Sequence, residues 1–448
     1  MERKDIANLI ENIDAMETCV RSASSMIYHS TPMTSYKEGP QLDIRDCLGV
    51  VCPATGRNAL VNGSTGLAKT HMAIAIAAGL AGSDYAILQI DPSLEQEKFF
   101  DIDGRLLQEG RLSDAIKDTP YITAPIVIYD ETNRAPQAML NILQAHLNNQ
   151  AITPSGGKPR KCGISVDGKG QYQFKIGTCN EGKQYDEGTF AMDPAFRRRF
   201  PFEAPVNLFA PTETDREMRQ RAGRTGTGLY VPETSGCIDS VLDVFRNLGL
   251  VETDLVAKEF IAYLGRMNQC LKSPFGTKDE AGFNAERCTG CHARGLAGET
   301  NICGNVYALP DATQMDLEVI AKGFALVRAH HKAAETGKMP SSLNVGLEDV
   351  IQAFPFVAAT KMGIDHAWLG KYFKSGEPIE AAKAVCVNIE QRIKKKLAKA
   401  SALMAKTDYT SDELAMMKSY CQEDPWAFGL RECNANPIKP VVYKGLRG

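Results

Sequence analysis

The chain has 448 residues, of which 44% are hydrophobic and 23% charged, as in an ordinary globular protein with about two or three domains. Its formal net charge of −3 excludes a strongly basic protein, although a local basic patch is compatible with this charge. No apolar run approaches the ~18 residues of a membrane span. The start of the chain lacks the apolar region of a signal peptide, and the 13 cysteines are scattered, so we expect reduced thiols and a cytoplasmic protein.

The first element that we expect is an amphipathic helix, because apolar residues recur there at helical spacing. These residues are Ile6, Leu9, Ile10, Ile13, Met16 and Val20. A stretch with Pro and Gly at residues 31–40 predicts a connector, and we place the end of this N-terminal segment at residue 44.

Between residues 45 and 205, short β-branched runs alternate with helical stretches. The expected strands are Ala59–Asn62, Ala86–Ile90, Ile126–Tyr129 and Phe174–Thr178, and the expected helices run from Lys69 to Leu80 and from Gln137 to Leu147. Such alternation predicts an α/β fold in which a mostly parallel sheet lies between layers of helices.

After residue 205 the periodicity is almost wholly helical, which predicts an all-α domain at residues 206–362 and a helical extension at residues 363–448. The clearest helical segments are Val241–Phe245, Leu255–Leu264, Leu317–His330 and Leu347–Val357. The basic run near Ile393 in the extension is more typical of a solvated helix face than of a nucleic-acid contact. We interpret the adjacent His330 and His331 as a favourable positive charge near a helix C-terminus.

The strongest functional pattern lies between the first expected strand of the core and its helix. It reads Gly63-Ser64-Thr65-Gly66-Leu67-Ala68-Lys69-Thr70, followed by His71. Glycines let backbone N–H groups surround phosphates, Lys69 would reach the β- and γ-phosphates, and the Thr70 hydroxyl would ligate Mg²⁺. The usual pattern has Gly in place of Ala68, and alanine costs little there if its φ is negative. His71 is a candidate contact by position, although a packing role is the simpler interpretation.

Two carboxylates, Asp130 and Glu131, follow the third expected strand of the core. At the carboxyl end of a parallel strand they would face the same crevice as the phosphate loop. We expect Asp130 to hold Mg²⁺ through water and Glu131 to polarise an attacking water molecule. The alternative is an exposed acidic pair at a strand end, and the preceding phosphate loop argues against it.

Two further patterns fit the same chemistry. Asn180 ends the next strand and would orient water near the γ-phosphate, unless it simply forms a turn. The run Arg197-Arg198-Arg199 would lend a guanidinium to a nucleotide held by a neighbouring subunit, unless it is a plain basic cluster on the surface.

These motifs, in this order, resemble the MoxR-type AAA+ ATPases of the helix-2-insert group. That family's phosphate loop accepts alanine before the lysine, and its D-E-I-N-R-A-P stretch corresponds to residues 130–136. Its sensor-1 segment corresponds to residues 177–180, and its D-R-F box to residues 198–200, which makes Arg199 the preferred arginine finger and Arg198 its neighbour. The resemblance covers residues 45–205 closely and the helical lid more loosely.

The resemblance implies an ATP- and Mg²⁺-dependent, homo-oligomeric ring, a hexamer in this family, that hydrolyses ATP between subunits. It also implies chaperone-like remodelling of a protein client, often with a partner that bears a von Willebrand factor A domain. Residues 99–104 would form a pore-facing loop, and residues 151–173 a pre-sensor hairpin. The chain departs from the family at Gln314, where the sensor-2 arginine would lie.

A cysteine-containing insertion at about residues 270–305 interrupts the expected lid. Cys288, Cys291, Cys303 and either His292 or Cys270 are candidates for a structural Zn²⁺ site. Since a second C-x-x-C pair is absent, simple thiols in a Gly-rich loop are the favoured alternative, and haem attachment to C-x-x-C-H would need an exported protein.

The sequence is compatible with two rival functions. A nucleic-acid motor is favoured only by the basic residues Lys158, Arg160 and Lys161 of the expected hairpin. A nucleotide-dependent scaffold with slow turnover is favoured by the missing sensor-2 arginine.

Overall fold

A computed structural model describes residues 3–24, 30–92, 96–136, 139–148, 151–154, 157–168, 170–181, 192–209, 211–222, 234–266, 309–364, 366–373, 378–387, 390, 410–412 and 415. The chain divides into two compact units, which are described separately. The first comprises Met1–Val251 and Lys322–Leu343, and the second comprises Glu252–Ala321 and Asn344–Gly448. In the part of the chain described, no helix combines the length and apolarity that crossing a membrane requires.

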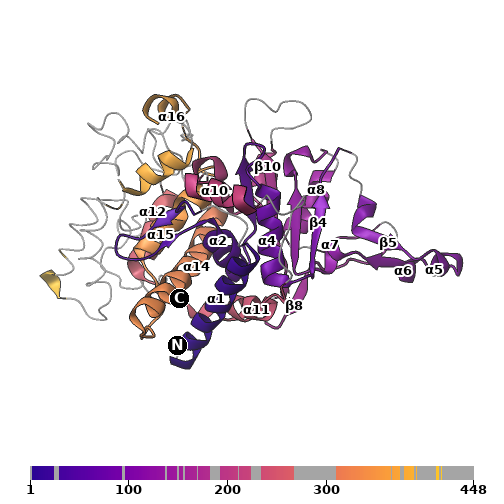
Figure 1. Ribbon diagram of the computed structural model, residues 1–448, viewed down its shortest axis with the longest axis horizontal. Helices are drawn as coiled ribbons and strands as arrows, with labels where there is room; N and C mark the ends of the chain where they lie inside the picture. The colour runs from indigo at the N-terminus through magenta and orange to yellow at the C-terminus, as the bar shows by residue number, and fades with distance from the viewer. Residues whose placement is uncertain are drawn as a thin grey trace. The chain divides into compact units, whose positions relative to one another are not determined.

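A parallel five-stranded sheet forms the centre of the first unit (Figure 1), in the order β11-β3-β10-β7-β4. The strands are β3 (Ala59–Gly63), β4 (Tyr85–Gln89), β7 (Ile126–Asp130), β10 (Phe174–Asn180) and β11 (Phe202–Pro205). The predicted α/β fold with a mostly parallel sheet is therefore confirmed. The sequence did not predict β11, a short edge strand that ends at Pro205, where the missing N–H is tolerated.

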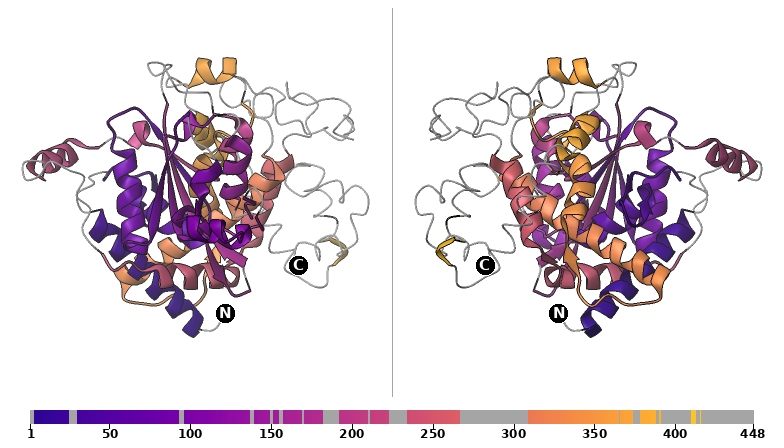
Figure 2. Two further views of the ribbon diagram at one scale, coloured as in Figure 1. Left: turned by 90° about the vertical axis from the view of Figure 1, so that its right-hand side faces the viewer. Right: turned by 90° about the vertical axis from the view of Figure 1, so that its left-hand side faces the viewer.

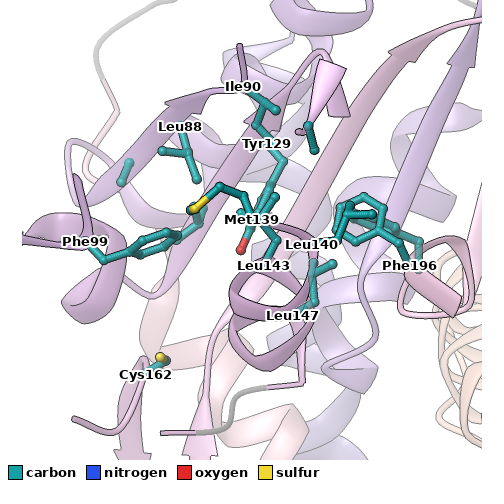
Figure 3. Close-up of a cluster of buried hydrophobic side chains, with 14 of the residues drawn as sticks. Leu88, Ile90, Phe99, Tyr129, Met139, Leu140, Leu143, Leu147, Cys162 and Phe196 are labelled. Carbon is teal, nitrogen blue, oxygen red and sulfur yellow. The ribbon is translucent and has the colours of Figure 1, made fainter. Parts of the chain in front are cut away.

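Helices cover both faces of this sheet (Figure 1), with α4 (Lys69–Ala81) on one side and α7 (Pro120–Thr123) and α8 (Leu140–Leu147) on the other. Tyr129 and Leu88 from the strands pack with Leu143 of α8 in a buried apolar cluster (Figure 3). This burial on both faces explains why β3, β7 and β10 are buried along almost their whole length, whereas the edge strand β4 alternates buried and exposed residues.

The expected N-terminal helix is α1 (Arg3–Ala23), which packs closely on α4. At the crossing, a Cβ added to Gly79 of α4 would lie only 2.9 Å from the carbonyl oxygen of Cys19. The domain boundaries expected from the sequence, after residues 44, 205 and 362, remain predictions.

Two antiparallel ribbons extend this core. In the first, β5 (Phe100–Ile102) pairs with β6 (Ile116–Asp118), and α5 (Gly104–Gln108) and α6 (Leu112–Ala115) lie between them (Figure 1). Phe99 is fully buried in the core cluster, so the prediction that it faces a pore is wrong, whereas Ile102 and Leu107 are exposed. The second ribbon, β8 (Ile164–Val166) with β9 (Gly170–Tyr172), forms a hairpin within the expected residues 151–173, whose pre-sensor role stays a prediction.

The helical prediction for the rest of the chain is confirmed where residues are described. The helices are α10 (Glu213–Ala222), α11 (Ile238–Asn247), α12 (Leu255–Arg266), α14 (Asp311–Thr336), α15 (Leu347–Ala358) and α16 (His366–Tyr372). In the second unit α12 packs on α15, and β12 (Glu252–Thr253) pairs with β13 (Asn344–Val345). The interpretation of His330 and His331 as charges at a helix end is wrong, because α14 continues to Thr336 and has no basic residue in its last turn.

Short elements connect these parts. They are β1 (Thr34–Ser35), β2 (Gln41–Leu42), α2 (Ile44–Asp46), the π-helical turn η1 (Cys47–Val51), α3 (Cys52–Thr55), α9 (Pro194–Arg197), and the 3₁₀ turns η2 (Gln96–Phe99), η3 (Thr132–Arg134), η5 (Val206–Phe209) and η7 (Leu248–Leu250). Figure 2 shows from two further sides how α1 and the orange end of α14 lie beside each other within the first unit.

Candidate nucleotide-binding site

The loop between β3 and α4 has the backbone of a phosphate-binding turn. Gly63 and Gly66 have φ values of 146° and 83°, which glycine adopts readily. A Cβ added to Gly66 would meet nothing within 4 Å, so the loop has open space on that side. Thr65 and Gly66 are exposed, and Ser64, Leu67 and Ala68 are partly exposed.

From the sequence, alanine at position 68 was expected to cost little if its φ were negative. In the structure the φ of Ala68 is instead 56°. The left-handed conformation costs an L-residue about 1–2 kcal/mol. Glu131 also has φ 56°, and these two are the non-glycine residues with positive φ in the described part of the chain. Backbone strain of this kind tends to cluster at functional sites.

The ammonium group of Lys69 lies at the centre of the site. Its Nζ donates to the carbonyl oxygens of Gly63 at 2.9 Å and Ser64 at 2.8 Å, and to Oδ1 of Asn180 at 2.8 Å. Burial lowers the pKa of Lys69, while Cys179, Asp130 and Glu131 act to raise it. The structure therefore brings Lys69 and Asn180 together, as expected of two groups that share one phosphate.

Asp130 ends β7 and lies beside the N-terminus of α4. Its Oδ1 accepts hydrogen bonds from the Thr70 hydroxyl at 2.7 Å and the Thr178 hydroxyl at 2.6 Å. The structure thus joins the two residues that the sequence proposed as Mg²⁺ ligands. It adds Thr178, which is nearly fully buried and was not singled out from the sequence.

Glu131 lies one residue further, at the start of η3. Its backbone N–H donates to the Thr178 hydroxyl at 3.2 Å, and its Oε2 lies 3.1 Å from Nε of Arg134 and 3.4 Å from Nε2 of Gln89. Sequence reasoning missed both Arg134 and Gln89. The i,i+3 spacing on a turn was a signal for Arg134, whereas Gln89 required knowledge that β4 lies beside β7.

The three arginines of the run 197–199 differ in their surroundings. Arg197 is held by Glu203 at 2.8 Å and Glu181 at 3.1 Å, and these carboxylates outweigh its burial and raise its pKa. Arg198 is exposed, and Arg199 is partly exposed with one N–H donated to the Ala195 carbonyl at 3.1 Å. Of the three arginines, Arg198 is therefore the exposed one, and Arg197 is the one held between two carboxylates.

The remaining positions singled out from the sequence are His71, the candidate zinc ligands and Gln314. His71 follows Thr70 on α4 and is partly exposed. The candidate zinc ligands Cys288, Cys291, His292 and Cys303, together with Cys270, lie outside the described residues. In the second unit the amide of Gln314 donates to the Leu309 carbonyl at 2.9 Å, just before its own helix, and to Asp311 at 3.1 Å, the first residue of that helix.

The chemistry of this site fits a magnesium–nucleotide complex. The Thr70 hydroxyl and the Asp130 carboxylate are hard oxygen ligands of the kind that Mg²⁺ prefers. The glycine loop, the N-terminus of α4 and Lys69 supply N–H donors and positive charge for phosphates. The same edge of a parallel sheet is where nucleotides bind in α/β folds.

Comparisons with known proteins agree with this geometry. Residues 58–200 match the family described as AAA domain (dynein-related subfamily). Chaperone protein ClpB 2 of Thermosynechococcus vestitus is 27% identical over 209 residues, which are 44% of this chain and 20% of that protein. Chaperone protein ClpB 1 of Synechocystis is 34% identical over 109 residues, 22% of this chain and 12% of that protein. The matches thus span a fifth or less of these relatives' length.

One solved structure resembles most of the chain. The crystal structure of a "putative ATPase" from Cytophaga hutchinsonii aligns over 83% of this chain and 96% of that chain, with a TM-score of 0.54 and 15% sequence identity. At this identity the likeness concerns the fold alone. Taken with the matched segment and the strand order, it identifies residues 58–200 as an AAA domain, built on an AAA+ αβα core.

Proposed function

We propose that this chain is an ATPase of the AAA+ class, similar to MoxR-type proteins, that works as a homo-oligomeric ring and remodels a protein client. The observation that supports this most is the convergence of Lys69, Thr70, Asp130 and Asn180 at one edge of the sheet through hydrogen bonds of 2.7–2.8 Å. These side chains come from three separate segments, and each has the chemistry that phosphoryl transfer requires at its position.

In this proposal the residues of this chain bind the nucleotide and orient the attacking water. Lys69 exchanges its bonds to the loop carbonyls for bonds to phosphate oxygens, and Thr70 and Asp130 hold the Mg²⁺ that neutralises charge on the nucleotide. Asn180 and Glu131 position and polarise the attacking water. Because Glu131 lies 3.1 Å from Arg134, breaking that ion pair would free its carboxylate to act as a base.

We infer that the site is completed in trans. Arg199, or its more exposed neighbour Arg198, would reach a nucleotide on the next subunit, since Arg197 is fixed between two carboxylates. The client is proposed to be a protein, because the relatives with the chaperone name share this part of the chain. A partner with a von Willebrand factor A domain and a ring of six subunits belong to the same proposal.

The Glu131→Gln variant, which should bind ATP without hydrolysing it, is the test of this function. Affinity capture from host lysate with Mg-ATP is run with and without nuclease, and the Lys69→Ala/Glu131→Gln double variant serves as the control that cannot bind ATP. A protein retained after nuclease by Glu131→Gln, and lost in the double variant, supports remodelling of a protein client. ATP turnover that survives Lys69→Ala would contradict the assignment of the site itself.

A nucleic-acid motor is the first rival, and the structure weakens its one support. Arg160 of the hairpin lies 3.6 Å from Asp118 and donates to the Ile116 carbonyl at 3.2 Å, so its guanidinium already has two partners on β6. Lys158 and Lys161 remain exposed. Loss of all capture on nuclease treatment, together with hydrolysis stimulated by duplex DNA, would establish this rival.

A slow ATP-dependent scaffold is the second rival. It is favoured by the neutral side chain of Gln314, which is bonded at the start of its own helix. Assembly of a ring on ATP without measurable phosphate release would establish it.

A further inference from the structure

Two helices of the first unit bring together three side chains that play no part in the nucleotide site. Glu17 lies on α1, and His330 and His331 lie on the part of α14 that belongs to the same unit. One ligand atom from each residue can be chosen so that all three lie within 4.8 Å of one another. Carboxylate oxygen and imidazole nitrogen are the common ligands of zinc-type ions.

The two distances from the Glu17 carboxylate to the imidazoles match those between ligands around one ion. Oε2 of Glu17 lies 3.2 Å from Nδ1 of His330 and 3.3 Å from Nε2 of His331. A tetrahedral ion with bonds of about 2.0–2.1 Å holds neighbouring ligand atoms about 3.3–3.4 Å apart. All three atoms are shielded from solvent, and their contacts with one another lie at ion-pair distance without hydrogen-bond geometry.

Adjacent residues on a helix point about 100° apart, so two consecutive histidines rarely share an ion. Here His330 presents Nδ1, the nitrogen near its backbone, and His331 presents Nε2, the far nitrogen of its ring. This difference in reach lets both rings meet the same carboxylate oxygen.

Neighbouring charges orient these ligands. Asp14 Oδ1 lies 3.0 Å from Nε2 of His330, so a proton on Nε2 leaves Nδ1 as the free lone pair. Nε of Arg21 donates to Oε1 of Glu17 at 2.7 Å and leaves Oε2 for the ion, while a second Arg21 nitrogen donates to Asp46 at 2.6 Å. Carboxylate partners of this kind fix the tautomer of metal-binding histidines.

We propose that Glu17, His330 and His331 bind one divalent transition-metal ion of the zinc type, with Asp14 as the positioning residue for His330. The two nitrogen ligands favour Zn²⁺, Co²⁺, Ni²⁺ or Cu²⁺ over Mg²⁺, which prefers oxygen, so this ion is distinct from the one expected at Asp130. Three protein ligands leave one position for water. The ion joins α1 to α14 and stabilises the first unit when it is bound.

The probe is Co²⁺, titrated into the full-length chain after treatment with a chelator. We expect one equivalent to give visible d–d absorption without a thiolate-to-cobalt band in the near ultraviolet, because the ligands are nitrogen and oxygen. The absence of that band distinguishes this site from any ion held by Cys288, Cys291 and Cys303. Zn²⁺ should displace the Co²⁺ and should raise the melting temperature of the protein.

Four variants decide the assignment. Glu17→Gln and His331→Ala should each weaken binding at least about 100-fold, and Asp14→Asn about 10–100-fold, because Asp14 acts through His330. Asp14 is exposed, so its variant should fold normally. Glu11→Gln, an exposed carboxylate on the same helix, is the control and should bind like the wild type. Cobalt binding that is absent, shows only thiolate bands, or is unchanged in Glu17→Gln, His331→Ala and Asp14→Asn would overturn the proposal and leave an ion pair between carboxylate and histidines.

Discussion

Lys175 lies near the start of β10 and is completely buried, so the stability of the sheet should depend measurably on pH. Burial lowers the pKa of its ammonium group from 10.5 to about 7, while the Cys162 thiol acts to raise it. The unfolded chain therefore binds more protons than the folded chain between pH 7 and pH 10.5. The contribution of Lys175 to the free energy of unfolding therefore rises with pH across that window.

The magnitude follows from these two pKa values. The lowered pKa of Lys175 reduces the free energy of unfolding by about 4 kcal/mol at pH 7 and by about 1.5 kcal/mol at pH 9.5. Lys175→Met removes this cost and also the contact of Nζ with the Gln173 carbonyl at 3.4 Å. Losing that contact lowers stability similarly at both pH values. The stability advantage of Lys175→Met over the wild type should therefore be larger at pH 7 than at pH 9.5 by about 3 kcal/mol.

The assay is urea unfolding followed by far-ultraviolet circular dichroism at both pH values, which reports the helices and strands of the core. Lys158→Met, which removes an exposed lysine, is the matched control and should show an advantage close to zero at both values. If the difference between Lys175→Met and the wild type is the same at pH 7 and pH 9.5, Lys175 does not titrate in this window and the reasoning from burial is refuted.

Three further predictions concern the nucleotide site. Thr178→Val removes the hydroxyl that donates to Asp130 at 2.6 Å. It should lower kcat for ATP about 10–100-fold, because a hydrogen bond to a charged group contributes about 1.5–3 kcal/mol. An unchanged kcat in a phosphate-release assay would show that this bond is dispensable. Arg199→Ala should lower ATP turnover more than Arg198→Ala does. Mixing the Arg199→Ala protein with a Lys69→Ala protein should restore part of the activity, because a mixed ring regains some complete sites. No recovery of turnover on mixing argues against action in trans. Ala68→Gly should leave the free energy of unfolding unchanged or raise it by up to about 1.5 kcal/mol. Glycine relieves the strain of the left-handed φ, but it also raises the conformational entropy of the unfolded chain, and the two effects oppose each other. A loss of about 1 kcal/mol in urea unfolding would mean that Ala68 is unstrained.

The sequence by itself determined the segments that carry the chemistry. The glycine loop and Lys69 lie between a strand and a helix, and Asp130 and Asn180 each end a strand, so local pattern was enough to place them. Strand–helix alternation likewise predicted the parallel sheet, because each apolar run must be buried on both faces.

Only the tertiary structure decided which side chains meet. The order of the strands puts Gln89 beside Glu131 and Thr178 beside Asp130, and an order of strands cannot be read from local periodicity. The sign of φ at Ala68 was equally beyond the sequence, because the chain on both sides of the residue sets it. The meeting of Glu17 with His330 depends most on the fold, since residues so far apart in sequence become neighbours only through the packing of whole helices.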